Sequence, residues 1–289
     1  MSIRDEIRLK FSGLNIAEKL IVVNTAIYIV NALVVFLFQL PVDFIMRWFE
    51  LPKDFSSFIL QPWSLFTYAF FHGSFMHLFW NMILLYFVGR FFLTVHSVKQ
   101  FISVYFLGAI AGGFLFLLSY NIFPVFSGVN SSLIGASAAV MAIMIFVCTY
   151  MPNMEVRLFF ILNVKLWYIG AALVLIDLVS LPFSNSGGHL AHLGGSLLGF
   201  VYAKKMQQGQ DIGSGFNRVL DSLNSLFTKK KKAPMKTVYR DRKTNTQSTP
   251  KGKSDHQKKI DAILDKISKS GYESLSKEEK DYLFTAGKE

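Results

Sequence analysis

Residue types that could carry out hydrolysis stand near the beginning of three long apolar segments. Ser137 opens one of these segments, and His192 lies at the head of another. A serine hydroxyl activated by an imidazole is the nucleophile and base pair of acyl transfer. The third segment begins with His77 and Asn81, whose side chains can donate hydrogen bonds to a developing oxyanion. The chemistry indicated is that of a serine hydrolase, if the three segments bring these residues together.

Composition places the segments in a lipid bilayer. Apolar residues make up 52% of the 289 residues, phenylalanine alone fills 29 positions, and charged residues account for 17%. A helix needs about 20 mostly apolar residues to cross the hydrocarbon core. Charge-poor runs predict six spans: 20–40, 75–92, 100–120, 133–151, 158–181 and the shorter 189–203.

Basic residues set the predicted orientation. The loops near 121–132 and 182–188 carry no charge, whereas lysine and arginine gather at the other ends of the spans: Arg4, Arg8, Lys10, Lys19, Arg90, Lys99, Arg157, Lys204 and Lys205. Cytoplasmic loops carry an excess of Lys and Arg. Both termini are therefore expected in the cytoplasm. The second, fourth and sixth spans are expected to begin near the outer surface, with the reactive residues in their first turns.

The spacing of small residues favours close packing around this chemistry. Gly195 and Gly199 follow His192 at i+3 and i+7, and the residues around Ser137 are also glycine and alanine. Small residues allow helix backbones to approach closely. The histidine and asparagine of the second span are four apart and share one helix face. A carboxylate to complete a triad is not expected nearby, because a buried charge is expensive in a membrane.

Together these motifs resemble those of the rhomboid family of intramembrane serine proteases. Residues 15–205 carry the resemblance, and its motifs occur in order on the appropriate spans: the block 61–81 with His72, His77 and Asn81, then Gly135-Ala136-Ser137, then Ala191-His192 followed by Gly195 and Gly199.

The resemblance implies an all-α membrane protein with a six-helix bundle that hydrolyses peptide bonds in or near transmembrane segments of other proteins. Ser137 would attack the scissile carbonyl and His192 would act as general base and then acid. No metal or cofactor is implied. The other site residues implied by the family are the oxyanion donors His77 and Asn81 and the supporting residues His72, Gly135, Gly195 and Gly199.

Two departures from the family pattern leave a different class of function open. The family usually has glycine after the serine, where this chain has Ala138. Many members place an aromatic residue one turn later, where this chain has Met141. The alternative is a catalytically inactive rhomboid-like protein that binds client transmembrane helices without cutting them.

The histidines allow a third hypothesis. His189 and His192 have a spacing compatible with a metal site, and a metal or proton transporter could use His72, His77 and His192. A zinc enzyme normally has further carboxylate or imidazole ligands, and no HExxH helix occurs in the sequence, so no metal is predicted. Asp177 lies inside the fifth span, where an ionisable residue is functional or paired. We expect it to make a structural hydrogen bond.

The composition changes after the last span. Residues 203–289 hold 20 of the 30 basic and 11 of the 19 acidic residues, which gives this tail +9 of the net charge of +11. Lys229, Lys230, Lys231 and Lys232 are expected to attract anionic lipid just inside the membrane, and no nucleic-acid motif is present. The predicted organisation is a cytoplasmic N-terminus (1–19), a protease domain (20–205), a basic disordered linker (206–254) and a C-terminal helical hairpin (255–289).

The C-terminal segment predicts two short amphipathic helices. Gly271 is placed to end the first, and Ser276 with Glu279 forms a capping box for the second. The first carries Ile260, Ile263, Leu264 and Ile267 at i, i+3, i+4 and i+7, and the second carries Tyr282, Leu283 and Phe284. A docking or regulatory role toward an unidentified cytoplasmic partner is expected, and the alternative is a marginal tail that folds only on contact. No organelle address is visible, so a bacterial cytoplasmic membrane is the predicted location.

Overall fold

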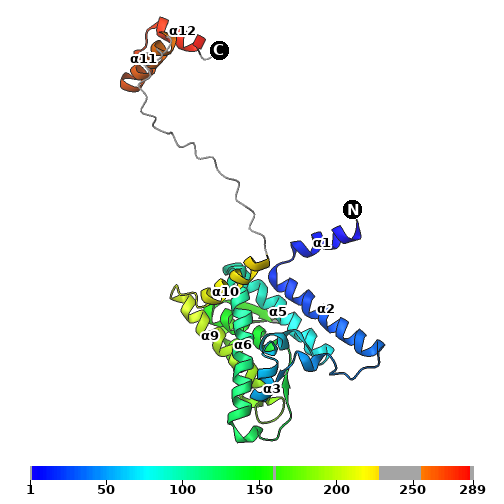
Figure 1. Cartoon of the computed structure of the whole chain (residues 1–289). Coiled ribbons are helices and arrows are strands. Elements are labelled where there is room, and N and C mark those ends of the chain that lie inside the picture. Colours follow the sequence, from blue (N-terminus) through cyan, green and yellow to red (C-terminus); the bar gives the residue numbers. More distant parts are fainter. Residues whose placement is uncertain (1, 159–160, 228–254, 287–289) are drawn as a thin grey trace, which may run out of the picture. The chain divides into compact units, whose positions relative to one another are not determined.

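The structure, a computed structural model, describes residues 2–158, 161–227 and 255–286. The chain separates into two compact units, Met1–Lys230 and Lys231–Glu289. All predicted site residues belong to the larger unit, so its architecture is given first (Figure 1).

Helices form most of the larger unit. They are α1 (Ile3–Gly13), α2 (Ile16–Leu37), α3 (Phe55–Leu60), α4 (Ser64–Thr67), α5 (Phe75–Val95), α6 (Val98–Ile122), α7 (Ser137–Tyr150), α8 (Leu166–Ser180), α9 (Ser186–Gln207) and α10 (Ser214–Phe227), with 3-10 turns η1 (Met46–Trp48), η2 (Tyr68–Phe70) and η3 (Pro124–Phe126). Two short antiparallel pairs complete the unit, namely β1 (Leu51–Pro52) with β2 (Ser132–Leu133) and β3 (Glu155–Leu158) with β4 (Leu162–Lys165).

The central helix is α7. Every residue from Ala138 to Cys148 is buried, because α5, α6, α8 and α9 all pack against this helix. The backbones of α7 and α9 approach closely because the α9 residues at the contact are glycines. Cβ atoms on Gly195 and Gly199 would collide with the carbonyl oxygens of Ala138 and Ala142. The predicted stripe of small residues is therefore the surface on which α9 contacts α7.

Caps fix where two of the site helices begin. Ser74 caps α5 by accepting a hydrogen bond from the backbone N–H of His77 at 3.2 Å. Asn185 has φ 47° in the left-handed region and caps α9 by accepting from the N–H of Gly188 at 3.3 Å. Side chains of this type satisfy N–H groups that have no partner inside the helix.

Two predicted span boundaries are wrong. Most of residues 158–165, assigned to the fifth span, are in strands, because β3 and β4 pair with each other and the side chain of Arg157 donates to that of Asn163. The helix of the predicted fifth span, α8, therefore begins only at Leu166. The helix of the predicted sixth span, α9, begins at Ser186 and not at His189, because Asn185 caps it. His192 therefore lies in its second turn.

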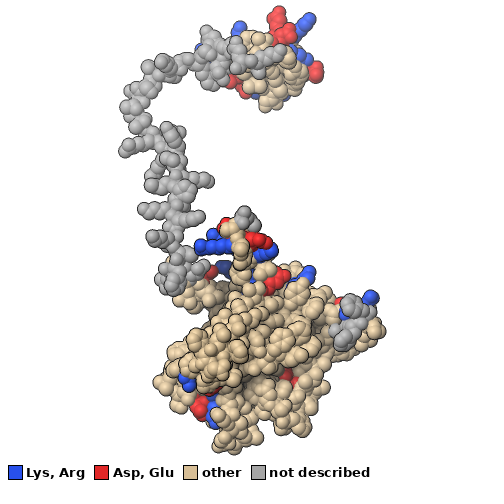
Figure 2. Space-filling view, turned by 90° about the vertical axis from the view of Figure 1, so that its right-hand side faces the viewer, with Lys and Arg blue, Asp and Glu red and all other residues tan. Residues whose placement is uncertain are grey.

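The larger unit has the surface and helices of a membrane protein. Three of its described helices, α2, α5 and α6, are long and apolar enough to cross a bilayer, and α7 and α8 are shorter apolar helices. Large apolar side chains point outward, for example Val30, Phe36 and Leu175. Figure 2 shows a broad area of this unit almost free of charged side chains. The count of six spans stays a prediction.

Residues assigned to the linker fold onto the larger unit. The hydroxyl of Tyr202 donates to the carboxylate of Asp211 at 2.5 Å, and the ammonium of Lys99 on α6 lies 2.7 Å from the carboxylate of Asp221 on α10. A linker starting at residue 206 therefore begins too early. The run Lys229 to Lys232 lies outside the described residues, so its lipid contact stays a prediction.

The smaller unit contains α11 (Asp255–Ser270), η4 (Tyr272–Ser274) and α12 (Lys277–Ala286). Gly271, with φ 78°, follows α11 and donates its N–H to the carbonyl of Ile267. Ser276 and Glu279 make the predicted reciprocal hydrogen bonds at the start of α12. Lys266 of α11 contacts both carboxylate oxygens of Glu279 at 2.9 Å, which ties the two helices together.

Candidate active site

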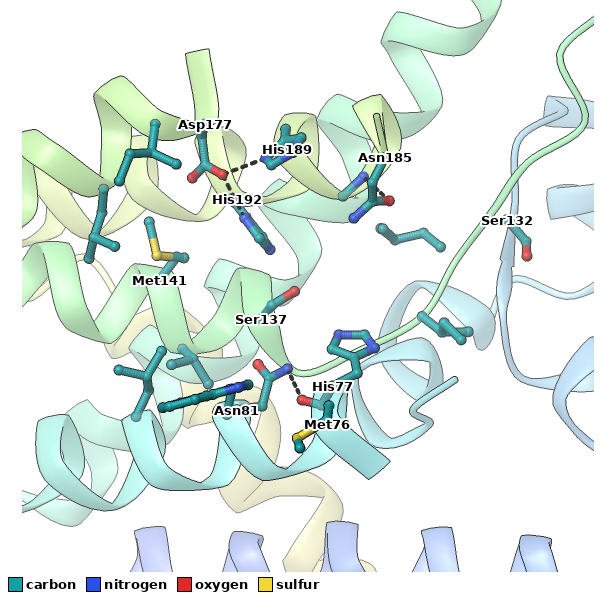
Figure 3. A pocket seen from close by; sticks show the side chains of 18 residues that line it. Met76, His77, Asn81, Ser132, Ser137, Met141, Asp177, Asn185, His189 and His192 are labelled. Carbon is teal, nitrogen blue, oxygen red and sulfur yellow. Dashed lines mark hydrogen bonds and ion pairs between the residues drawn. The ribbon is translucent and has the colours of Figure 1, made fainter. Parts of the chain in front are cut away.

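One cavity of about 620 Å³ in the larger unit brings together residues from four helices. Its lining includes Ser137 from α7, His192 from α9, and His77 and Asn81 from α5. Asp177 of α8 lies in the same lining. The three segments singled out by the sequence therefore meet in space, and a fourth helix contributes a carboxylate (Figure 3).

Ser137 is the first residue of α7, and Ala136 before it makes no side-chain cap. The first N–H groups of a helix have no partner inside the helix and carry the positive end of its dipole. The loop before the helix turns at Gly135, whose φ of 119° favours glycine and whose N–H donates to the carbonyl of Tyr68 at 2.9 Å. The serine side chain thus lies beside backbone donors suited to an oxyanion.

His192 is held on the side away from Ser137. Its Nδ1 lies 2.9 Å from Oδ1 of Asp177, and Nδ1 of His189 lies 2.7 Å from the same oxygen. Figure 3 shows Asp177 and Ser137 on opposite sides of the His192 ring. The described structure contains no hydrogen bond between Ser137 and His192, although both line the cavity.

The shared carboxylate sets the tautomer of both rings. An ionised carboxylate can only accept hydrogen bonds, so His189 and His192 both donate from Nδ1. A neutral His192 then has its lone pair on Nε2, the nitrogen that is free to face the serine. The expectation that no carboxylate lies nearby is wrong, because α8 packs against α9 and brings Asp177 to both histidines.

The predicted oxyanion donors lie on the other side of Ser137 in Figure 3. The buried Asn81 donates one amide hydrogen to the carbonyl of His77 at 2.8 Å, which leaves its second hydrogen available. The His77 ring lies against Gly135, where a Cβ atom would come within 2.6 Å of Cε1 and Nε2. Both side chains line the cavity beside the serine.

His72 supports the loop that precedes the serine. Its Nε2 accepts a hydrogen bond from the backbone N–H of Ala136 at 3.4 Å, and its ring meets that of His77 edge to face at 5.1 Å. Burial lowers the pKa of the His72 imidazole to about 3, so this ring is neutral and able to accept. It contacts the backbone beside Ser137 and does not line the cavity.

Comparison with known proteins assigns the larger unit. Residues 60–208, slightly more than half of the chain, match the rhomboid domain. The chain belongs to the rhomboid family. A second match covers residues 240–285 of this rhomboid protein and is to a family of unknown function (DUF6576).

Two relatives of this rhomboid protein are mitochondrial by name. Rhomboid protein 1, mitochondrial, of Saccharomyces cerevisiae is 32% identical over 177 residues, which are 60% of this chain and 50% of the yeast protein. The presenilin-associated rhomboid-like protein, mitochondrial, of Rattus norvegicus is 28% identical over 207 residues, or 70% and 52% of the two chains. The chain spans about half the length of the curated relatives it matches. The predicted bacterial location has no support from these relatives.

The pairing of Asp177 with two histidines is the feature that sequence reasoning missed. The signal was an ionisable residue inside an apolar segment, which is functional or paired. The sequence pattern led us to expect a structural hydrogen bond but not its partners, because 15 residues and the left-handed turn at Asn185 separate Asp177 from His192.

Proposed function

We propose that this rhomboid protein is a serine endopeptidase that cuts other membrane proteins in or near their transmembrane segments. Ser137 is the nucleophile, and His192 is the general base and then the acid for the leaving amine. The observation that carries the proposal is the cavity that holds both residues, with the Nδ1 of His192 bound by Asp177 so that Nε2 can receive the serine proton. Membership of a family that includes intramembrane serine proteases supports it.

Asp177 is proposed as a positioning residue in this reaction. It acts through His192 and not on the substrate directly. Its carboxylate holds the base in one tautomer and stabilises the imidazolium that forms. The backbone N–H of Ser137, with the side chains of His77 and Asn81, is proposed to hold the oxyanion. These donors and the base approach the serine from different sides, as the tetrahedral intermediate requires.

The length of α7 supports attack inside the membrane. Its 14 residues span only about 21 Å at 1.5 Å per residue, against roughly 30 Å of hydrocarbon. Ser137 at its start is then recessed below the surface, and the cavity is its route to water. We propose the predicted six-span topology with both termini in the cytoplasm, so that the cavity opens outward. The inactive alternative depends on Ala138 and Met141, and nothing in the site geometry favours it.

Cleavage of a transmembrane reporter by purified protein in liposomes tests the proposal. Ser137→Ala and His192→Ala should each abolish cleavage, and a fluorophosphonate should label Ser137 only when His192 is present. Ser132→Ala is the matched control, because Ser132 lines the same cavity but has no proposed role. Normal cleavage by either dyad variant, or absence of labelling in a folded parent protein, contradicts the proposal.

A further inference from the structure

Asp177, His189 and His192 form a cluster whose chemistry is not confined to hydrogen bonding. One ligand atom from each residue, a carboxylate oxygen or an imidazole nitrogen, lies within 4.8 Å of the other two. The two histidines are three residues apart on α9, and the aspartate comes from α8. All three side chains line the cavity, so a cation and a water molecule can reach them.

The donor set fits zinc. Two imidazole nitrogens and one carboxylate, with a water molecule as fourth ligand, are a common zinc combination. Tetrahedral bonds of about 2.05 Å place neighbouring ligand atoms about 3.3 Å apart. The distances from Asp177 Oδ1 are 2.7 Å to His189 and 2.9 Å to His192, so a small outward rotation of the side chains opens the required space. Calcium and magnesium prefer all-oxygen sites.

We propose that Asp177, His189 and His192 form an inhibitory site for zinc or a similar borderline divalent cation. The inhibition, though not the binding, rests on the proposed function of His192. A cation bound to Nδ1 of His192 displaces the proton from that nitrogen. The neutral ring then carries a proton on Nε2, with no net loss of a proton from the imidazole, and it cannot accept one from Ser137.

The position of the site makes it inhibitory and not catalytic. Figure 3 shows the carboxylate of Asp177 on the side of the His192 ring that is remote from Ser137. A cation held there faces neither the serine nor the oxyanion donors His77 and Asn81. Its bound water is therefore badly placed to attack a carbonyl at the serine, and its main effect is on the histidine.

Binding is measured first, without reference to activity. The full chain, purified in detergent with a tag that contains no histidine, is titrated with zinc in competition with a chromophoric zinc indicator. Cobalt is used in parallel because tetrahedral cobalt gives a visible absorption band. One equivalent should bind. Loss of a residue that only hydrogen-bonds a metal ligand weakens metal binding by about 10- to 100-fold. His189 is itself a proposed ligand, so His189→Ala should weaken zinc binding at least tenfold.

The control is another histidine outside the cavity. His96 caps the end of α5 and packs against Phe92 and Phe146, and His96→Gln should bind zinc as the parent does. Failure of the parent to bind one equivalent overturns the proposal. Equal binding by parent and His189→Ala, or equal loss in His96→Gln, also overturns it.

Activity then tests the inhibition. Saturating zinc should suppress reporter cleavage and fluorophosphonate labelling of the parent reversibly, with recovery on addition of a chelator. His189→Ala should keep its cleavage activity and need at least tenfold more zinc for the same inhibition. Unchanged cleavage at saturating zinc overturns the inhibitory role. A folded parent that binds zinc through His189 but never cleaves the reporter refutes the proposed protease and leaves the binding site supported.

Discussion

The methyl group of Ala138 on α7 packs against Gly112 of α6, where a Cβ atom would lie only 2.6 Å from it. The same hypothetical atom would lie 2.6 Å from the carbonyl oxygen of Ala191 on α9. The methyl group of Ala138, which a glycine at this position would lack, therefore has room because residue 112 on α6 is a glycine. Gly195 still contacts the backbone of Ala138 from α9, so the departure from the family pattern does not separate α7 from α9.

Substituting Gly112 tests this packing. Gly112→Ala should lower the free energy of unfolding by about 1–3 kcal/mol, because it adds a methyl group where three helices already meet. Combining it with Ala138→Gly should recover part of the loss, since only the contact with Ala191 remains. Thermal unfolding in detergent measures both. Gly13→Ala is the control, as its Cβ would meet nothing within 4 Å, and equal melting of Gly112→Ala and the parent would refute the explanation.

Replacing Asp177 should slow the chemical step. An asparagine side chain at this position has no negative charge to stabilise the imidazolium of His192, so Asp177→Asn should reduce kcat at least tenfold, within the limit of about 10⁴-fold known for such a partner. KM should stay close to the parent value, because Asp177 does not bind substrate. Steady-state cleavage separates the two constants. Asp221→Asn removes an exposed ion pair with Lys99 and serves as control; a purely structural Asp177 would leave kcat of the folded variant unchanged.

The proposed oxyanion donors should behave differently from the proposed dyad of Ser137 and His192. His77→Ala and Asn81→Ala should each lower turnover by about 10²- to 10³-fold, while the fluorophosphonate still labels Ser137 because the base remains. Single-turnover cleavage and labelling are compared on the same preparations. Met76→Ala changes a neighbouring cavity residue that lacks a donor and should have little effect. Two fully active donor variants would remove these residues from the mechanism.

Local sequence signals predicted the parts of the fold that depend on neighbours in the chain. The small-residue run at 135–139, the glycines after His192 and the capping pair Ser276 and Glu279 all have the expected structural roles. The strands β3 and β4 were missed because their apolar residues Leu158, Leu162 and Val164 were read as the start of the fifth span. The helix α10 was missed although its apolar residues Phe216, Val219, Leu220 and Leu223 follow a helical repeat, because the charge of the tail dominated the interpretation.

Truncation distinguishes the two units. A chain ending after Lys230 removes only the smaller unit and should keep its melting temperature and its cleavage activity in detergent. A chain ending after Lys205 also removes Asp211 and with it the hydrogen bond from the Tyr202 hydroxyl, at a cost of about 1.5–3 kcal/mol for a hydrogen bond to a charged group. It should melt at a lower temperature. Equal melting of the two truncated proteins would show that residues 206–230 add no stability.

Acid should loosen the smaller unit. The hydrogen bond from Lys266 holds the pKa of the Glu279 carboxyl below its ordinary value. A carboxyl whose pKa is lower when folded contributes stability above its ordinary pKa and loses it as pH falls through the folded value. Glu279→Gln should therefore reduce amide protection of residues 260–284 at pH 7, and the difference from the parent should vanish in acid. Hydrogen exchange measures this at matched pH, and equal protection at pH 7 would contradict it.

The burial of every α7 residue from Ala138 to Cys148 also limits which substitutions the protein tolerates. On α2 only Ala17, Leu20 and Asn24 are buried, so most positions face outward and accept any apolar replacement of similar character. From Ala138 to Cys148 no such face exists. A substitution scan should therefore show helical periodicity of tolerance along α2 and a uniform intolerance along α7. Substitutions in the helix that carries Ser137 therefore require compensating substitutions in the four helices that pack against it.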